Sequence, residues 1–202
     1  MFSRNDDAIA LRADGNEVRR NRLSRNGNGI GIEGNRNLVR GNRVDRTRGA
    51  GGFGIPLARG DHNVIARNVV RGSQTFGISV GFEPGAGNVV RRNRIRGAGQ
   101  AGVLVDSRGK RTLLVGNFIR GAAKDGVLVK PTAEQTLLRG NIASGAGDDG
   151  FDIRSRSAKL TSNRAVRNGA LGIEAVFGVI DGGGNIARHN GVPRQCTNTF
   201  CT

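Results

Sequence analysis

Three aspartates lie within the stretch GDDGFDI, which covers residues 147–153. Carboxylates held close together raise the pKa of one of their number, so that one can donate a proton while another accepts one. Several carboxylate oxygens in one place are also the ligands that Ca²⁺ prefers. The alternative is that Asp148 and Asp149 are polar turn residues and that Asp152 lies in a salt-bridged outer face. The choice between these interpretations depends on the fold that positions the side chains.

The sequence of 202 residues repeats at intervals of 21 to 27 residues. One half of each repeat is a short apolar stretch followed by an asparagine and a further apolar residue, as in NVVRRNRI (88–95) and TLLVGNFI (112–119). The asparagines in this slot are Asn21, Asn42, Asn68, Asn93, Asn117, Asn141, Asn163 and Asn190. The other half is a glycine, an apolar residue, any residue and a second apolar residue, as in GISV (77–80), GVLV (126–129) and GFDI (150–153). The aspartates therefore belong to one unit of a repeating structure.

The apolar runs are short, rich in β-branched side chains, and broken by glycine or asparagine. These are strand and turn signals, and they exclude long helices. Three short strands with turns in each repeat describe one coil of a parallel β-solenoid, whose stacked coils bury a continuous apolar core. We expect each asparagine to occupy a left-handed bend and to join an internal ladder, and each glycine to adopt a positive φ.

This repeat resembles that of the right-handed parallel β-helix repeat proteins, the pectin-lyase-like class, and is most similar to their secreted bacterial members. The resemblance covers about residues 7–192. It implies an all-β fold, namely a right-handed single-stranded parallel β-helix of about eight coils with three short strands per coil. The β-helix domain is expected at residues 1–192, followed by a C-terminal tail at 193–202. The class contains polysaccharide lyases, glycoside hydrolases, uronan epimerases, phage tailspikes and adhesins, so the resemblance implies a fold more than an activity.

Motifs of the catalytic members of this class are incomplete in the chain. Polygalacturonase-like members combine an Asp-Asp pair with a later Gly-His-Gly and an Arg-Ile-Lys. Asp148 and Asp149 are present here, but Gly-His-Gly is not, and neither is the Asp-Pro-His of alginate epimerases. His62 and His189 occupy turn positions of the repeat. The motifs therefore do not decide between an enzyme and a binding protein.

The repeat predicts a carboxylate patch that spans several coils. Equivalent residues on stacked coils lie about 4.8 Å apart, and Asp152 and Glu174 hold the same outward slot on adjacent coils. Asp125 and Asp149 both precede a corner glycine. As a catalytic set we expect Asp149, Asp152 and Glu174 as acids or Ca²⁺ ligands, with Lys130 or Arg154 as the base.

Two further features of this patch follow from the same slots. The one cofactor that the pattern suggests is Ca²⁺, with Asp125, Asp149 and Asp152 as candidate ligands. Leu104 and Leu128 hold the outward slot on the preceding coils, where we expect them to form a shallow apolar floor.

The chain is strongly basic, with a formal net charge of +16 that is almost all arginine. One edge of the predicted solenoid is lined by Arg19, Arg22, Arg40, Arg43, Arg91 and Arg94. Guanidinium groups match carboxylates, sulfates and phosphates, so this edge predicts a polyanionic partner. The alternative is that these arginines are solvated and screened by salt. The absence of tyrosine and tryptophan speaks against binding of single-stranded nucleic acid, which uses stacking platforms.

Cys196 and Cys201 lie close together near the C-terminus, which predicts a small disulfide-closed loop and an oxidising compartment. Two free thiols in a frayed tail are the alternative. The N-terminal stretch carries no secretory signal, and no apolar run is long enough to span a membrane. Because AIAL (8–11) begins in mid-coil without a capping helix, we expect an N-terminally truncated domain from the cell surface or the extracellular space.

The leading functional hypothesis is a β-helix domain that binds or processes an acidic polysaccharide. If it is an enzyme, β-elimination or epimerisation at a uronate is the expected chemistry. The rival is a non-catalytic structural or adhesive solenoid, and nucleic-acid binding is a weaker third. The oligomeric state is not predicted.

Overall fold

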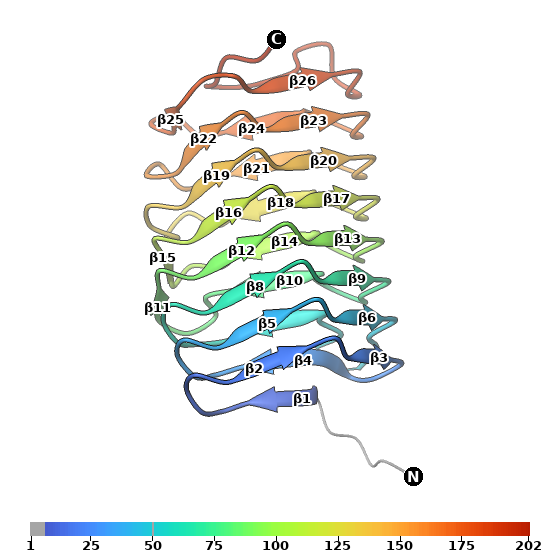
Figure 1. The fold of residues 1–202 in the computed structure, drawn as a ribbon. Helices are drawn as coiled ribbons and strands as arrows, with labels where there is room; N and C mark the ends of the chain where they lie inside the picture. Colours follow the sequence, from blue (N-terminus) through green and yellow to red (C-terminus); the bar gives the residue numbers. More distant parts are fainter. Residues whose placement is uncertain (1–6, 50) are drawn as a thin grey trace.

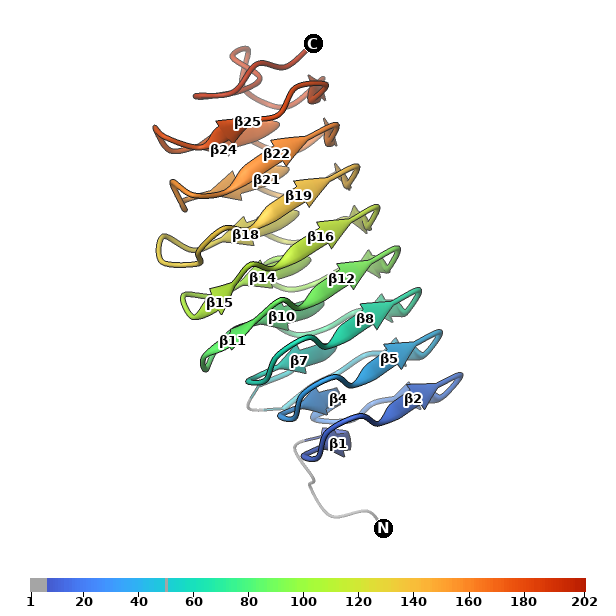
Figure 2. The same ribbon diagram turned by 60° about the vertical axis from the view of Figure 1, so that its left-hand side comes forward.

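The computed structural model describes residues 7–49 and 51–202, which form a β-solenoid of stacked coils (Figure 1). Strands run from β1 to β26, and no helix occurs in these ranges. Three strands per coil stack into three parallel sheets of eight strands each, named sheets A, B and C here (Figure 2). The predicted fold class, coil number and strand number per coil are therefore confirmed.

Sheet A contains β1 (Asp7–Leu11), β4 (Asn28–Ile32), β7 (Ile55–Leu57), β10 (Ile78–Val80), β14 (Val103–Val105), β18 (Val127–Val129), β21 (Phe151–Ile153) and β24 (Ile173–Ala175). Sheet B contains β2 (Glu17–Arg19), β5 (Leu38–Arg40), β8 (Val64–Ala66), β12 (Val89–Arg91), β16 (Leu113–Val115), β19 (Leu137–Arg139), β22 (Lys159–Thr161) and β25 (Ile180–Asp181). Sheet C contains β3 (Arg22–Ser24), β6 (Arg43–Asp45), β9 (Val69–Arg71), β13 (Arg94–Arg96), β17 (Phe118–Arg120), β20 (Ile142–Ser144), β23 (Arg164–Val166) and β26 (Ile186–Arg188). A small fourth sheet pairs β11 (Gly85–Ala86) with β15 (Gly109–Lys110).

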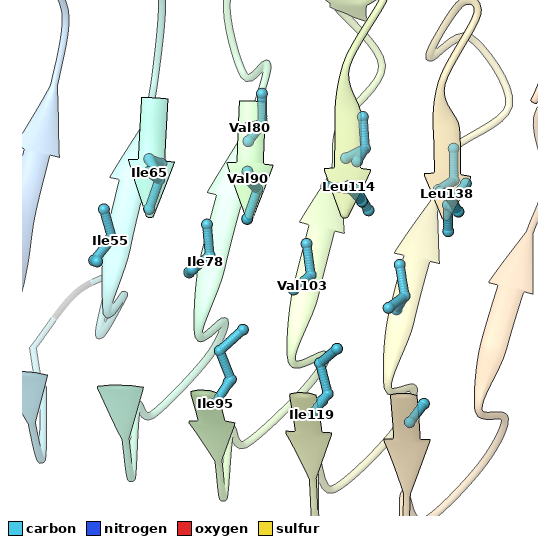
Figure 3. Packing of buried hydrophobic residues seen from close by; sticks show 14 of the residues in the cluster. Ile55, Ile65, Ile78, Val80, Val90, Ile95, Val103, Leu114, Ile119 and Leu138 are labelled. Carbon is cyan, nitrogen blue, oxygen red and sulfur yellow. The ribbon is translucent and has the colours of Figure 1, made fainter. Parts of the chain in front are cut away.

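The core is a stack of apolar side-chain layers, mostly aliphatic, and Figure 3 shows several of them. In one coil the layer consists of Ile78 and Val80 from β10, Val90 from β12 and Ile95 from β13, each at most 1% exposed. Alternation along each strand places these side chains inward and their neighbours outward. Because full burial of such a side chain contributes roughly 1.5–3 kcal/mol, the repeated layers provide the main force that holds the coils together.

A ladder of asparagines runs through the solenoid between sheets B and C, as predicted. The backbone N–H and the side-chain Nδ2 of Asn93 both donate to Oδ1 of Asn117 on the next coil, each at 3.0 Å. Nδ2 of Asn93 also donates to the carbonyl oxygen of Ile65 at 2.9 Å. The predicted conformation is wrong, however, since the left-handed bend belongs to the residue before the asparagine. Arg92 has a φ of 54° and Gly116 a φ of 60°.

The predicted position of the last ladder asparagine is also wrong. Asn163 donates to Oδ1 of Asn185 at 3.0 Å, so Asn185 and not Asn190 continues the ladder. The last coil has a two-residue β25 followed by glycines, and this shortened segment shifts the apparent repeat. Asn190 instead accepts from the backbone N–H of Asn168 at 2.9 Å, one turn further along the coil.

The corner glycines before the sheet A strands are required by close packing. Gly126 does not have a positive φ, contrary to the prediction. A Cβ atom at Gly126 would lie 2.5 Å from the carbonyl oxygen of Gly150 and 2.6 Å from Cβ of Ala143. A side chain is therefore excluded by the next coil and by the core, and the glycine column follows from that contact.

The C-terminal segment packs on the last coil, and a disulfide joins Cys196 and Cys201 as predicted. The backbone of Cys196 forms a parallel β-bridge with that of Ile173, and the backbone of Cys201 forms one with that of Asn185. Oε1 of Gln195 accepts the backbone N–H of Asn190 at 3.1 Å. The segment therefore covers the end of the core. In the described residues we find no helix that is long and apolar enough to cross a membrane.

Candidate functional site

The predicted carboxylates come together on the outer face of sheet A. Asp152 in β21 lies directly opposite Glu174 in the neighbouring β24. Asp149, Asp152 and Glu174 each place a carboxylate oxygen within 4.8 Å of the others. The parallel register of the coils explains this, because it brings residues 22 positions apart in the sequence side by side. These three residues are called the carboxylate cluster below.

Asp152 is buried beneath Arg154. The Asp152 side chain is 4% exposed while that of Arg154 is 55% exposed. Arg154 donates from Nε and Nη2 to Oδ2 of Asp152, at 2.8 and 2.5 Å. This hydrogen bonding, together with the charge of Asp152, raises the pKa of the guanidinium further. Arg154 therefore stays protonated, which favours a fixed positive charge over the role of base considered for it.

Asp149 is the carboxylate of the cluster whose protonation changes near neutral pH. It is 5% exposed, and its burial raises the pKa to about 7. The backbone N–H of Leu171 donates to its Oδ1 at 2.7 Å and works against this shift. The hydrogen bond with Glu174 and the charges of Asp148 and Glu174 raise the pKa of Asp149 further. A carboxyl with this pKa can both give and take a proton at pH 7.

Asp125 lies beside the cluster but is not one of its three members. Burial, and next the charge of Asp152, raise the pKa of Asp125 to about 6. Its carboxylate groups with those of Asp148 and Asp149 within 4.8 Å, so the predicted Ca²⁺ ligands are divided between two groups that share Asp149. Both groups offer the hard oxygen ligands that Ca²⁺ takes. In the carboxylate cluster Arg154 already occupies Asp152, and a cation there would compete with it.

Lys130 lies next to the cluster and is paired elsewhere. Its Nζ is 3.2 Å from Oδ1 of Asp106, on the preceding coil. This ion pair places Lys130 at the border of the patch, in the slot that Arg154 holds one coil later.

An aromatic group occupies the other half of the same face, and the sequence reasoning missed it. Phe53 and Phe76 precede corner glycines, in the slot that holds Asp125 and Asp149 on later coils. The rings of Phe53 and Phe76 stack with centroids 5.8 Å apart, and Phe82 meets Phe53 edge-on at 5.4 Å. The slot of Phe53 and Phe76 could have been read from the repeat, whereas Phe82 lies in a loop without a repeat position.

The expected apolar floor differs from the structure. Leu104 is 1% exposed, so it is buried although it holds an outward slot, and Leu128 is half-buried. The outward slot of sheet A is therefore buried at Leu104 and Asp152, half-buried at Leu128 and exposed at Glu174. The outer face of sheet A changes from aromatic at Phe53 and Phe76 to acidic at Asp149 and Glu174.

The predicted arginine edge is divided between two sheets. Arg19 and Arg40 lie opposite each other in sheet B, and Arg22 and Arg43 do so in sheet C. Nε of Arg40 contacts Glu17 at 2.6 Å, and Arg43 pairs with Asp45. The remaining two residues of the predicted edge are Arg91 in β12 and Arg94 in β13. The turn that holds the ladder asparagines separates the sheet B arginines from the sheet C arginines. The six side chains therefore do not line one surface.

Comparison with known sequences agrees with this architecture. The sequence model of a family described as right-handed β-helix region matches residues 2–119 and 85–199, which together span nearly the whole chain. The chain belongs to this right-handed β-helix family. No curated protein matches it significantly.

Solved structures show the same fold at low sequence identity. A mutant of the periplasmic alginate epimerase AlgG is 20% identical, with a TM-score of 0.74 over 89% of this chain and 48% of that one. A protein of Geobacillus virus E2 is 10% identical, with a TM-score of 0.66 over 96% of this chain and 52% of that one. A pectate lyase is 15% identical, with a TM-score of 0.53 over 83% of this chain and 58% of that one. This β-helix chain thus spans about half the length of the structures it resembles.

Proposed function

We propose that the outer face of sheet A binds an acidic polysaccharide and that the carboxylate cluster transfers a proton at a uronate sugar. The observation that carries this proposal is the direct opposition of Asp152 and Glu174, with Asp149 within 4.8 Å of both. A proton-transfer group, a fixed positive charge and an exposed carboxylate thus lie at one place on the solenoid.

Arg154 would bind the carboxylate of the sugar. A guanidinium has five N–H donors in a planar fork that matches a carboxylate, and Asp152 uses two of the nitrogens. Neutralising the uronate carboxylate makes the neighbouring C5 proton more acidic. Removal of that proton is the difficult step of this chemistry. Ca²⁺ bound at Asp149, Asp152 and Glu174 would supply the same positive charge.

Asp149 would take the C5 proton in its ionised form. In a lyase reaction, the electron pair of the C5–H bond forms the C4–C5 double bond and expels the glycosidic oxygen at C4. Glu174 or protonated Asp149 then gives that oxygen a proton. In an epimerase reaction, a donor other than Asp149 gives C5 a proton on the opposite face of the ring, and Asp149 later releases its own proton to solvent. Both reactions need a group whose pKa lies near the working pH, and that of Asp149 is raised to about 7.

The structural neighbours support a uronan as the substrate class. The names of two of them refer to alginate and pectate, which are polymers of uronic acids. The periplasmic location in one of these names and the Cys196–Cys201 disulfide support a place outside the cytoplasm. These neighbours are 15% and 20% identical to the chain, so the carboxylate cluster itself carries the assignment.

A binding protein without turnover is the second candidate. Arg154 neutralises Asp152, as an ion pair on a purely structural outer face would do. His62 and His189 lie at turns before Asn63 and Asn190, and neither belongs to the carboxylate cluster. A solenoid that only holds its polysaccharide would need no proton-transfer group.

Exchange of the C5 proton separates the two candidates. The protein is incubated with alginate or polygalacturonate in deuterated water, with Ca²⁺ or with a chelator. Deuterium at C5 is followed by NMR, and unsaturated products are followed by ultraviolet absorbance. We expect exchange or elimination that is lost in Asp149→Asn and Glu174→Gln, while Glu134→Gln, an exposed carboxylate elsewhere, keeps it. Binding of either polymer without exchange under both conditions would leave the binding-protein candidate.

A further inference from the structure

Three arginines form a ladder on sheet C. Arg71 in β9, Arg96 in β13 and Arg120 in β17 lie opposite one another in adjacent parallel strands. All three side chains are exposed. Neighbouring strands are about 4.8 Å apart, so the ladder presents three guanidinium groups in a row along the solenoid axis. None of these residues belongs to the arginine edge that the sequence predicted.

This arginine ladder has no counter-charge in the described part of the chain. None of its three members makes an ion pair there, although several other arginines of the protein do. Asp45 lies opposite Arg71, but its carboxylate is paired with Arg43 in the same strand. Like charges directly opposite on adjacent strands destabilise a sheet. The ladder therefore weakens the fold unless an anion lies over it.

The surroundings of the ladder strengthen its positive potential. Arg94 is exposed in β13, two residues before Arg96, and so points to the same face. It also makes no ion pair among the described residues. Further along sheet C the ladder slot holds Ser144, Val166 and then Arg188, so the run of three adjacent arginines lies on the middle coils.

We propose that this ladder binds a linear acidic polysaccharide laid along the solenoid axis, at a face separate from the carboxylate cluster. The identity of the polyanion rests on the proposed function, because a uronan carries one carboxylate on every sugar. Each guanidinium would pair with a carboxylate of the polymer. Because the three arginines lie in a row along the solenoid axis, the polysaccharide would run in that direction. A second contact on the same long polymer raises its local concentration at sheet A.

The composition of the face favours a polysaccharide over a nucleic acid. Single-stranded nucleic acids are held by stacking on aromatic rings as well as by charge. Phe118 is the one aromatic residue in the strands of sheet C, and it is half-buried. The chain has no tyrosine or tryptophan. A carboxylated polymer needs only the guanidinium row.

Two triple variants with the same change of net charge test the ladder. In the ladder variant Arg71, Arg96 and Arg120 are each changed to Gln. In the control variant Arg12, Arg139 and Arg156 are changed to Gln; these are exposed residues away from sheet C. Dissociation constants are measured for long alginate, long polygalacturonate and single-stranded DNA at one fixed salt concentration. The thermal unfolding of each variant verifies that it is folded.

We expect the ladder variant to bind the polyuronates at least about tenfold more weakly, with a change of less than about threefold in the control variant. Changing the same three residues to Lys should restore part of the affinity, because charge returns without the planar fork. Equal losses in both triple variants, or no loss in either, would overturn the proposal. Weaker binding of DNA with unchanged binding of polyuronate would overturn the choice of occupant.

The ladder and the carboxylate cluster can fail separately. Short oligouronates that reach only sheet A should undergo C5 exchange equally in the parent protein and in the ladder variant. If no exchange occurs in the parent protein but the ladder variant loses polymer affinity selectively, the ladder stands and the catalytic assignment falls. The reverse result removes the ladder and leaves the catalytic assignment in place.

Discussion

Asp152 is held by Arg154 through two hydrogen bonds to a single carboxylate oxygen, Oδ2. The Asp152 carboxylate is buried and the Arg154 guanidinium is exposed. The pair therefore places a negative charge beneath the surface of sheet A and a positive charge above it. On the preceding coils the slot of Asp152 holds Leu104 and Leu128. The polar pair therefore interrupts an apolar column, at the point where the carboxylates gather.

Replacement of Arg154 should destabilise the protein, because the buried Asp152 then has no partner. We expect Arg154→Gln to lower the free energy of unfolding by about 1–3 kcal/mol, because Asp152 is left charged and buried without its partner. Urea unfolding measures the change, with Arg156→Gln as the control at an exposed arginine nearby.

An apolar residue at position 152 should remove the need for this ion pair. Adding Asp152→Leu to Arg154→Gln should restore the stability to within about 1 kcal/mol of the parent, since leucine fits the column on the preceding coils. The double variant should lose uronate chemistry. A double variant no more stable than Arg154→Gln would mean that the column cannot accept a leucine at this coil.

Stability should fall as the pH rises through the range in which the buried carboxyls ionise. The pKa of Asp149 is raised to about 7 and that of Asp125 to about 6, mainly by burial. The folded protein therefore holds protons that the unfolded chain has already lost, and the free energy of unfolding decreases between pH 4 and pH 7. The stabilising contribution is present at low pH and is lost as each group titrates.

Urea unfolding at pH 5 and pH 8 checks this dependence. We expect Asp149→Asn and Asp125→Asn each to flatten it and to raise the stability at pH 8. Glu134→Gln serves as the exposed control and should leave the slope unchanged. An equal slope in all three variants would assign the dependence to other groups.

The sequence permits the opposition of Asp152 and Glu174 to be predicted, because a regular repeat determines the register and the register determines neighbours. It does not reveal that Arg154 turns back onto Asp152, since a long side chain in an outward slot can reach several partners. The contact of Phe82 with Phe53 is hidden for a different reason: the loop that carries Phe82 has no equivalent on other coils. The place of Asn185 in the asparagine ladder is not evident from the sequence, because the shortened β25 shifts the repeat in the last coil.

The role of the corner glycines gives a test that contrasts two substitutions to alanine. Gly126 has an ordinary φ, but its Cβ would meet the next coil at 2.5 Å. Gly121 has a φ of 63° and no atom within 4 Å of a built Cβ. We expect Gly121→Ala to cost about 1–2 kcal/mol through backbone strain alone.

Gly126→Ala should cost more than Gly121→Ala, because the coils must separate to admit the methyl group. Chemical denaturation gives both values, and loss of folding in Gly126→Ala alone would agree with the packing argument. A smaller cost at Gly126 than at Gly121 would contradict it.

Arg92 occupies a left-handed turn position that the repeat fills with glycine elsewhere. Its φ is 54°, and the equivalent Gly116 has a φ of 60°. A left-handed conformation costs a residue other than glycine roughly 1–2 kcal/mol, which is partly offset because glycine loses more freedom on folding. We therefore expect Arg92→Gly to leave the protein equally stable or up to about 1 kcal/mol more stable. Arg91→Gly, one residue earlier in β12, should cost about 0.5–1 kcal/mol. Thermal unfolding of the two variants at one pH measures the contrast. If Arg92→Gly is the more damaging of the two, the arginine side chain holds the turn through contacts of its own, and the strain at φ 54° is offset within the fold.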